Sequence, residues 1–120
     1  MTLPLPIKEI LSRCLAALRG GYSIHFLGEL PDQAENRVLY LLGNPHPWSA
    51  TLLCPCHCGT LIQLSLIEAD SPRWALEHSL LGLPTLSPSV WRTKGCQAHF
   101  FLRQGRISWC GAKPEPQRRP

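Results

Sequence analysis

Apolar residues near the amino terminus recur at intervals of three or four positions, the spacing of one helix face. The apolar positions are Ile7, Ile10, Leu11, Cys14, Leu15 and Leu18, and the polar positions between them are Lys8, Glu9, Ser12 and Arg13. Pro6 suits a first helical turn, and Gly20-Gly21 ends the pattern. The pattern predicts one amphipathic helix over residues 6–19, with Cys14 buried on its apolar face.

From residue 22 onward the pattern changes to short runs of β-forming residues. The predicted strands cover residues 22–27, 37–42, 49–53, 60–67 and 74–77. Residues 31–36 form a polar loop, the stretch 43–47 is a turn, and residues 80–88 are a connection because they contain Pro and Gly. Residues 54–59 therefore form the turn of a β-hairpin, and residues 89–92 lead toward a second cysteine cluster.

The last hairpin has a predictable register, because Gln104-Gly105 suits a two-residue turn. Arg103 then faces Arg106, and the opposed pairs continue backward until His99 faces Cys110. Directly opposed residues have Cβ atoms about 4.5–5.5 Å apart, so this register brings Cys110 close to His99. The core face of the hairpin carries Phe100, Leu102, Ile107 and Trp109, and the other face carries His99, Phe101, Ser108 and Cys110.

The length and composition indicate a single folded domain. The chain has 120 residues, of which 44% are hydrophobic and 17% charged, and its twelve prolines favour short elements with many turns. We expect a small α+β fold over residues 1–110, mostly β hairpins with one N-terminal helix and stabilised by zinc. Residues 111–120 have no apolar anchor and are expected to form a disordered basic tail.

The charge and hydropathy pattern bounds the partners and the location. The net charge is +4, and the tail holds three basic residues against Glu115, so the body is too weakly basic to indicate nucleic-acid binding on charge alone. The sequence contains neither a stretch of 18 apolar residues nor a signal-peptide pattern at its start. We therefore expect a cytoplasmic protein without membrane contact, in which clustered cysteines are metal ligands or redox groups.

Two clusters carry the candidate chemistry. The first is Cys54-Pro55-Cys56-His57-Cys58-Gly59, and the second is Cys96-Gln97-Ala98-His99 followed by Cys110. Thiolates and imidazole at such spacing are typical of a tetrahedral Zn²⁺ site. The six candidate ligands are Cys54, Cys56, Cys58, Cys96, His99 and Cys110, and His57 is expected to face outward.

A tetrahedral site has four ligand positions, whereas the sequence offers six candidate ligands. Either two of the cysteines are spare, or the protein binds two metal ions. A Rieske-like or mononuclear iron centre is a redox alternative, although Rieske sites need two His ligands. A catalytic zinc lacks support, because no hydrolytic His-Glu motif is present. The basic residues Arg92, Lys94, Arg103 and Arg106 flank the second cluster and would serve a nucleic-acid-binding zinc module. The four tryptophans are expected mostly in the core.

The ordered motifs resemble a family of small uncharacterised bacterial zinc-binding proteins. They are Cys54-Pro-Cys-x-Cys-Gly59, Pro88-Ser89-Val90-Trp91, Gly95-Cys96-x-x-His99-Phe100 and Gly105-Arg-Ile-x-Trp109-Cys110. The resemblance covers residues 50–110 and departs at His57, where the family commonly has Gly. Members are encoded beside ubiquitin-like modifiers, their activating and conjugating enzymes and isopeptidases, in gene sets associated with antiviral defence against phage.

The resemblance implies a metal-binding accessory factor. Our hypothesis from the sequence is a zinc-binding adaptor that docks a conjugating enzyme or a ubiquitin-like modifier, as ligase modules do, without catalytic residues of its own. The alternatives are the nucleic-acid-binding module and the redox centre.

Overall fold

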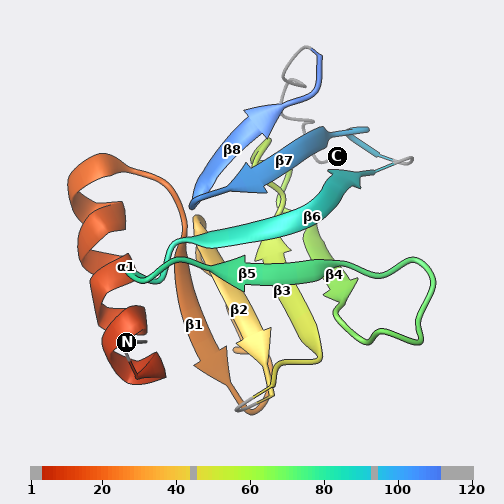
Figure 1. The fold of residues 1–120 in the computed structure, drawn as a ribbon. Coiled ribbons are helices and arrows are strands. Elements are labelled where there is room, and N and C mark those ends of the chain that lie inside the picture. The colour runs from red at the N-terminus through yellow and green to blue at the C-terminus, as the bar shows by residue number, and fades with distance from the viewer. Residues whose placement is uncertain (1–3, 44–45, 93–94, 112–120) are drawn as a thin grey trace.

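The computed structural model describes residues 4–43, 46–92 and 95–111 and contains one helix and eight strands in these ranges (Figure 1). The elements are α1 (Leu5–Arg19), β1 (Ser23–Leu27), β2 (Val38–Leu42), β3 (Ser49–Leu53), β4 (Leu61–Ser65), β5 (Ala75–His78), β6 (Pro84–Trp91), β7 (His99–Arg103) and β8 (Arg106–Trp109). The predicted fold class, a mostly β domain with one N-terminal helix, is confirmed. The predicted tail from residue 112, Lys94, and part of the 43–47 turn lie outside the described residues.

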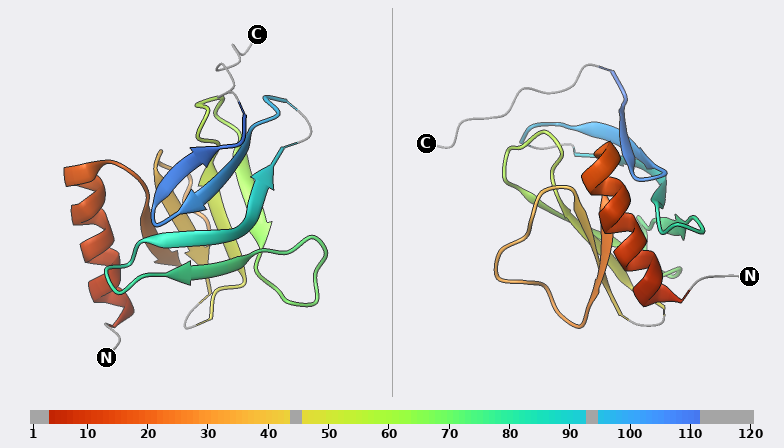
Figure 2. Two further views of the ribbon diagram at one scale, coloured as in Figure 1. Left: turned by 45° about the horizontal axis from the view of Figure 1, so that its top comes forward. Right: turned by 90° about the vertical axis from the view of Figure 1, so that its left-hand side faces the viewer.

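Two four-stranded sheets, β1-β2-β3-β4 and β5-β6-β7-β8, form the body of the molecule. β1 and β2 are parallel, whereas the other neighbouring strands are antiparallel. The views in Figure 2 show the second sheet lying across the first, with α1 beside β1. One hydrophobic cluster joins residues of both sheets, among them Leu39, Leu52, Leu86 and Phe100, so their inner faces share one core.

The helix is predicted within one residue of its bounds, but its orientation is not the predicted one. Cys14 is exposed, which contradicts its predicted place in the core, and Ile10 is 61% exposed. The packed side instead contains Ser12, which is fully buried and whose Oγ accepts a hydrogen bond from the N–H of Ile24 at 3.1 Å. Lys8 is also buried, with its Nζ 3.0 Å from Nδ1 of His78. Hydrogen bonds of polar side chains therefore help to fix the packing of this helix, and the spacing of apolar residues does not reveal them.

The helix α1 is not long and apolar enough to cross a membrane, and the described residues contain no other helix.

β6 occupies most of the stretch predicted as a connection, so that prediction was wrong. Pro84 is the first residue of the strand, a position at which proline is tolerated. The register of β6 against β7 shifts between Leu86 and Val90, so that three residues of β6 lie opposite Phe101 alone. Pro88 lies in this bulge, another position open to proline. The prolines of β6 thus mark a strand start and a bulge within a strand, whereas the sequence pattern suggested that no strand was present.

The β7–β8 hairpin has the predicted register throughout. Arg103 pairs with Arg106, and the N–H of Cys110 donates to the carbonyl of His99 at 2.8 Å. Gln104 and Gly105 have φ values of 49° and 77°, as a two-residue turn of this kind requires. Its core face packs against the hydrophobic cluster as predicted, and the opposite face is turned away from the core. Of the four tryptophans, Trp74 and Trp109 pack against the core, whereas Trp48 and Trp91 are 51% and 64% exposed.

Candidate metal centre and the neighbouring serine–histidine pair

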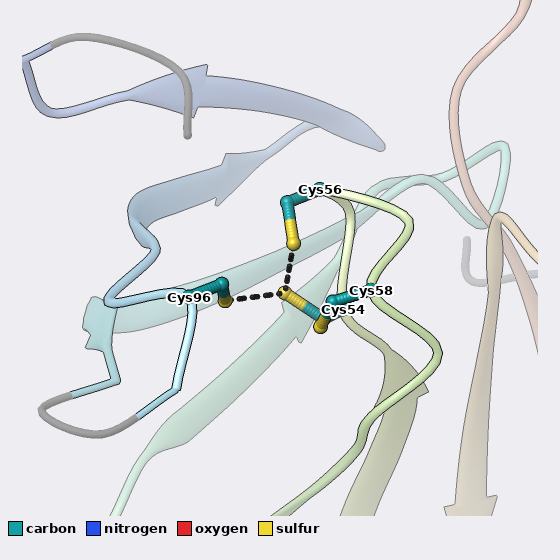
Figure 3. A group of neighbouring side chains, drawn as sticks. All are labelled: Cys54, Cys56, Cys58 and Cys96. Atoms are coloured by element: carbon teal, nitrogen blue, oxygen red, sulfur yellow. Dashed lines mark hydrogen bonds between the residues drawn. The ribbon is translucent and has the colours of Figure 1, made fainter. Parts of the chain in front are cut away.

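Four cysteine side chains from two loops converge at one end of the two sheets (Figure 3). The β3–β4 turn supplies Cys54, Cys56 and Cys58, and the β6–β7 loop supplies Cys96. Their sulfur atoms all lie within 4.8 Å of one another, and the Sγ of Cys54 is 3.4 Å from that of Cys56 and 3.6 Å from that of Cys96. Ligands at about 2.3 Å from a tetrahedral ion lie about 3.8 Å apart, so this arrangement fits one four-coordinate metal ion.

The geometry of the β3–β4 turn explains why alternating cysteines point to one place. The N–H of Cys54 donates to the carbonyl of Thr60 at 2.8 Å, and the N–H of His57 donates to that of Cys54 at 3.1 Å, which closes a compact loop. His57 and Gly59 have φ values of 69° and 83°, so both adopt the left-handed conformation that a tight turn uses. The side chain of His57 is exposed, as the sequence predicted, and does not join the four cysteines.

The electrostatics of the cluster favour a bound cation. Burial raises the pKa of the Cys54 and Cys56 thiols, because a lone thiolate is poorly solvated there. For Cys58 burial acts in the same direction, but hydrogen bonds with Thr60, and next with Cys56 and Cys54, together outweigh it and lower its pKa to about 6. Four thiolates this close are stable only beside positive charge, which a metal ion provides.

Arg92 supplies part of that positive charge. Its Nη1 donates to the sulfur of Cys96 at 3.0 Å and to that of Cys58 at 3.5 Å. Its N–H also bonds the carbonyl of Ala98 at 2.8 Å, which closes the base of the β6–β7 loop. Hydrogen bonds of this kind orient metal-binding thiolates and offset their negative charge. The side chain of Arg92 is thus directed at the cysteines, whereas the sequence suggested it for a nucleic-acid-binding surface.

The other two predicted ligands are placed outside this four-cysteine group. Nε2 of His99 lies 2.9 Å from the hydroxyl oxygen of Ser89, and Cys110 is the backbone neighbour of His99 in the hairpin. Their metal-binding role stays a prediction, as does the ligand role of the four cysteines themselves. The group contains no histidine among the described residues, which removes the argument for a Rieske-like centre.

Ser89 is the residue that the sequence reasoning missed. It lies in the β6 bulge, next to Val90, which is buried and pairs with the buried Phe100. Successive residues of a strand point to opposite faces, so Ser89 and His99 share the face turned away from the core. Bulges re-aim side chains in this way and occur beside active sites. The signal was present in the Pro88-Ser89-Val90-Trp91 motif, which carried the resemblance without a role for its serine.

Aromatic side chains hold both members of the pair. The ring of Trp91 stacks on the His99 imidazole, with centroids 5.1 Å apart and planes at 19°. Nε1 of Trp74 donates to the carbonyl of Ser89 at 3.3 Å. Among the described residues, Nδ1 of His99 has no acidic hydrogen-bond partner. The arrangement is therefore a Ser–His dyad in which stacking orients the imidazole, and it has no third member in the part of the chain that the structure describes.

The fold and the site define a small two-sheet β protein with a four-cysteine group in two loops, suited to a metal ion, and an outward-facing Ser–His dyad on two strands of the second sheet. The chain belongs to the BubE family: the model described as "Bacterial ubiquitination-like system serine protease" matches residues 26–110. The predicted association with a bacterial ubiquitination-like system is confirmed at this level. The match begins after α1 and includes both cysteine loops and the dyad. Searches of curated proteins and of solved structures returned no match.

Proposed function

We propose that the protein is a serine hydrolase of a bacterial ubiquitination-like system, which cleaves acyl bonds formed by the carboxyl terminus of a ubiquitin-like modifier. The observation that carries this proposal is the 2.9 Å contact between the Ser89 hydroxyl and Nε2 of His99 on an open sheet face. A nucleophile and a base within hydrogen-bond reach form the core of such a site. The description of the BubE family supports the same reaction class.

In this mechanism Ser89 Oγ attacks the carbonyl carbon of the scissile bond while Nε2 of His99 takes the hydroxyl proton. The C–O bond forms, negative charge moves to the carbonyl oxygen, and the tetrahedral intermediate then expels the leaving group. His99 gives its proton to the departing amine or alcohol, and a water molecule activated by His99 releases the acyl group from Ser89. Each step requires His99 to carry a proton on Nδ1 at the outset, so that Nε2 can accept.

The β6 bulge offers a donor for the negatively charged oxygen. Ser89 has no paired residue in the registers of β6 with β5 and β7, and we assign its own N–H as this donor. A backbone N–H at the nucleophile is a common part of oxyanion holes. The stack of Trp91 on His99 keeps the imidazole plane fixed while the proton moves, a task that an aspartate performs in Ser–His–Asp sites.

The metal proposed for the four cysteines is Zn²⁺, with a structural role. A set of four thiolates, three of them buried and that of Cys58 half-buried, fills every position of a tetrahedral ion, as is typical of structural zinc, and it supplies cross-linking without chemistry at the dyad. Cys96 belongs to the loop that joins β6 and β7, and these two strands carry Ser89 and His99. Anchoring that loop to the β3–β4 turn therefore fixes the spacing of the dyad.

Cleavage of a fusion tests the proposal. The zinc-loaded protein is incubated with the ubiquitin-like protein of the same system fused through its carboxyl terminus to a reporter, and the products are read by gel and mass spectrometry. We expect cleavage at the junction, loss of at least about 100-fold in Ser89→Ala, and retention in Ser108→Ala, an exposed serine on the same face of the sheet. Cleavage that survives in Ser89→Ala would refute the assignment.

An adaptor role is the second proposal, and the exposed Trp91 favours it, because exposed aromatic residues mark protein-binding surfaces. It predicts that Ser89→Ala still supports conjugation or phage defence in cells, whereas Trp91→Ala does not. The hydrolase proposal predicts loss in both variants. A cytoplasmic location and nucleic-acid binding through Arg103 and Arg106 stay predictions.

A further inference from the structure

The outer face of the second sheet carries positive charge on the same strand as the histidine of the dyad. Along β7 this face presents His99, then Phe101, then Arg103, at steps of about 6.6 Å for every second residue of a strand. Phe101 is also the residue opposite the three-residue bulge that contains Ser89. The neighbours of the dyad on this face are therefore an aromatic ring and an arginine.

Arg103 is held close to the dyad by this ring. The guanidinium carbon lies 3.9 Å from the centroid of Phe101, so the charge leans over the ring, toward His99 and Ser89. A stacked guanidinium keeps its in-plane N–H groups free for two parallel hydrogen bonds to a carboxylate. The stacking also restricts the arginine side chain before a ligand binds. Less conformational entropy is therefore lost on binding than an unrestrained exposed arginine would lose.

No ion pair in the described part of the chain neutralises this charge. Arg103 is directly opposite Arg106 on the same face, and like charges in that relation destabilise a sheet. The one ion pair among the described residues joins His25 and Glu9, far along the chain from this hairpin. Glu77 of β5 lies on the same face, two strands from Arg103 in the cross-strand row through Thr85 of β6, but it makes no ion pair with either arginine. Two exposed, unpaired arginines at this place are a cost in the free protein that an anionic ligand would offset.

We propose that Arg103, stacked on Phe101, is a specificity-determining subsite for a carboxylate of the substrate, two residues away from the scissile bond. This inference rests on the proposed hydrolase function and names a feature of its substrate. The spacing follows from the geometry: an extended peptide advances about 3.3 Å per residue, and the guanidinium lies over Phe101, about 6.6 Å along β7 from His99. Arg106, opposite Arg103, adds charge but no stacked contact.

The carboxylate has two chemical sources, an acidic side chain or the free carboxyl end of a modifier precursor. Both present the same planar anion to the guanidinium. Internally quenched peptides separate them: one set carries Glu, Gln or Lys at each of three positions on either side of the cleaved bond with an amidated end, and a second set compares free with amidated ends. A preference within the first set indicates a side chain, and a preference for free ends indicates the terminus.

The expected result is a preference of about 10-fold in kcat/KM for the carboxylate at the position two residues from the bond. Arg103→Gln should reduce the preference to within about twofold, and Arg103→Glu should reverse it toward Lys. Arg13→Gln, at an exposed arginine of α1, is the matched control and should leave the preference unchanged. Equal rates for Glu and Gln peptides in the wild type, or a preference that persists in Arg103→Gln, would overturn the proposal.

A binding measurement keeps this result separate from failure of the hydrolase proposal. Dye-labelled Glu and Gln peptides are titrated with the full-length Ser89→Ala protein, whose Arg103 is intact, and with the Ser89→Ala, Arg103→Gln double variant. Tighter binding of the Glu peptide that disappears in the double variant supports the subsite even where no cleavage is seen. Equal affinity of both peptides for both proteins overturns it even where Ser89 proves to be the nucleophile.

Discussion

Replacing Cys96 by Ser tests whether a metal ion cross-links the two loops. Cys96 is the one member of the four-cysteine group that belongs to the second sheet; the other three lie in a single turn of the first. The substitution removes the connection between these loops while leaving the shape of the side chain nearly unchanged. We expect it to abolish metal retention, because three thiolates in one turn form an incomplete structural site.

The size of the effect follows from the chain between the loops. The metal closes a loop of about 40 residues, from Cys58 to Cys96, and the chain-entropy relation for a cross-link of that length gives about 4 kcal/mol. Total stabilities of small domains are about 5–15 kcal/mol, so the variant should lose a large share of its free energy of unfolding. Arg92 adds to the loss, since its hydrogen bond to the Cys96 sulfur would no longer meet a metal-bound thiolate.

The assay combines metal analysis with urea unfolding. The wild-type protein should contain about one zinc per chain, and Cys96→Ser should contain almost none and unfold at a clearly lower urea concentration. Cys14→Ser is the matched control, because Cys14 is exposed on α1 and should change neither quantity. A Cys96→Ser protein with full zinc content and an unchanged midpoint would refute the cross-link.

Two further predictions concern stability. His57 has a φ of 69°, so His57→Gly should relieve backbone strain and raise the free energy of unfolding by about 0.5–1 kcal/mol; a lower melting temperature for this variant would contradict that reading. Burial, and next the charge of Lys8, lower the pKa of His78, so the native state binds fewer protons than the unfolded state, whose His titrates near 6.5. Stability should therefore decrease as the pH falls below about 6.5 toward the lower folded pKa. The His78→Gln substitution should weaken this pH dependence. Equal urea midpoints at pH 7.5 and 5.5 in the wild type would show that His78 does not contribute.

The sequence predicted the elements whose cause is local. The β7–β8 register follows from Gln104-Gly105 and alternating side chains, and the β3–β4 hairpin follows from the apolar runs on either side of its turn. β6 was missed because prolines were read as breakers, while their effect depends on where a bulge falls, which only pairing with β7 decides. The face of α1 was misassigned because Ser12 and Lys8 find polar partners distant in sequence.

The candidate site was predictable only in part, for a similar reason. Short spacing identified the cysteines of one turn, and the motif spacing added Cys96. The Cys96-x-x-His99 spacing predicts a ligand role for His99, which stays a prediction; in the structure β7 begins at His99, whose Nε2 lies 2.9 Å from the hydroxyl oxygen of Ser89. A lone serine between Pro88 and Val90 carries no periodic or compositional signal. Its relation to His99 depends on a cross-strand contact that the fold creates.

The most direct test of the central claim is to map the site of covalent labelling by a fluorophosphonate, which reacts with serines activated by a base. We expect one adduct, on Ser89, formed at least about 100-fold more slowly in His99→Gln than in the wild type at equal zinc content. An adduct on another serine, or labelling of Ser89 at the same rate in His99→Gln, would contradict the assignment of Ser89 and His99 as nucleophile and base.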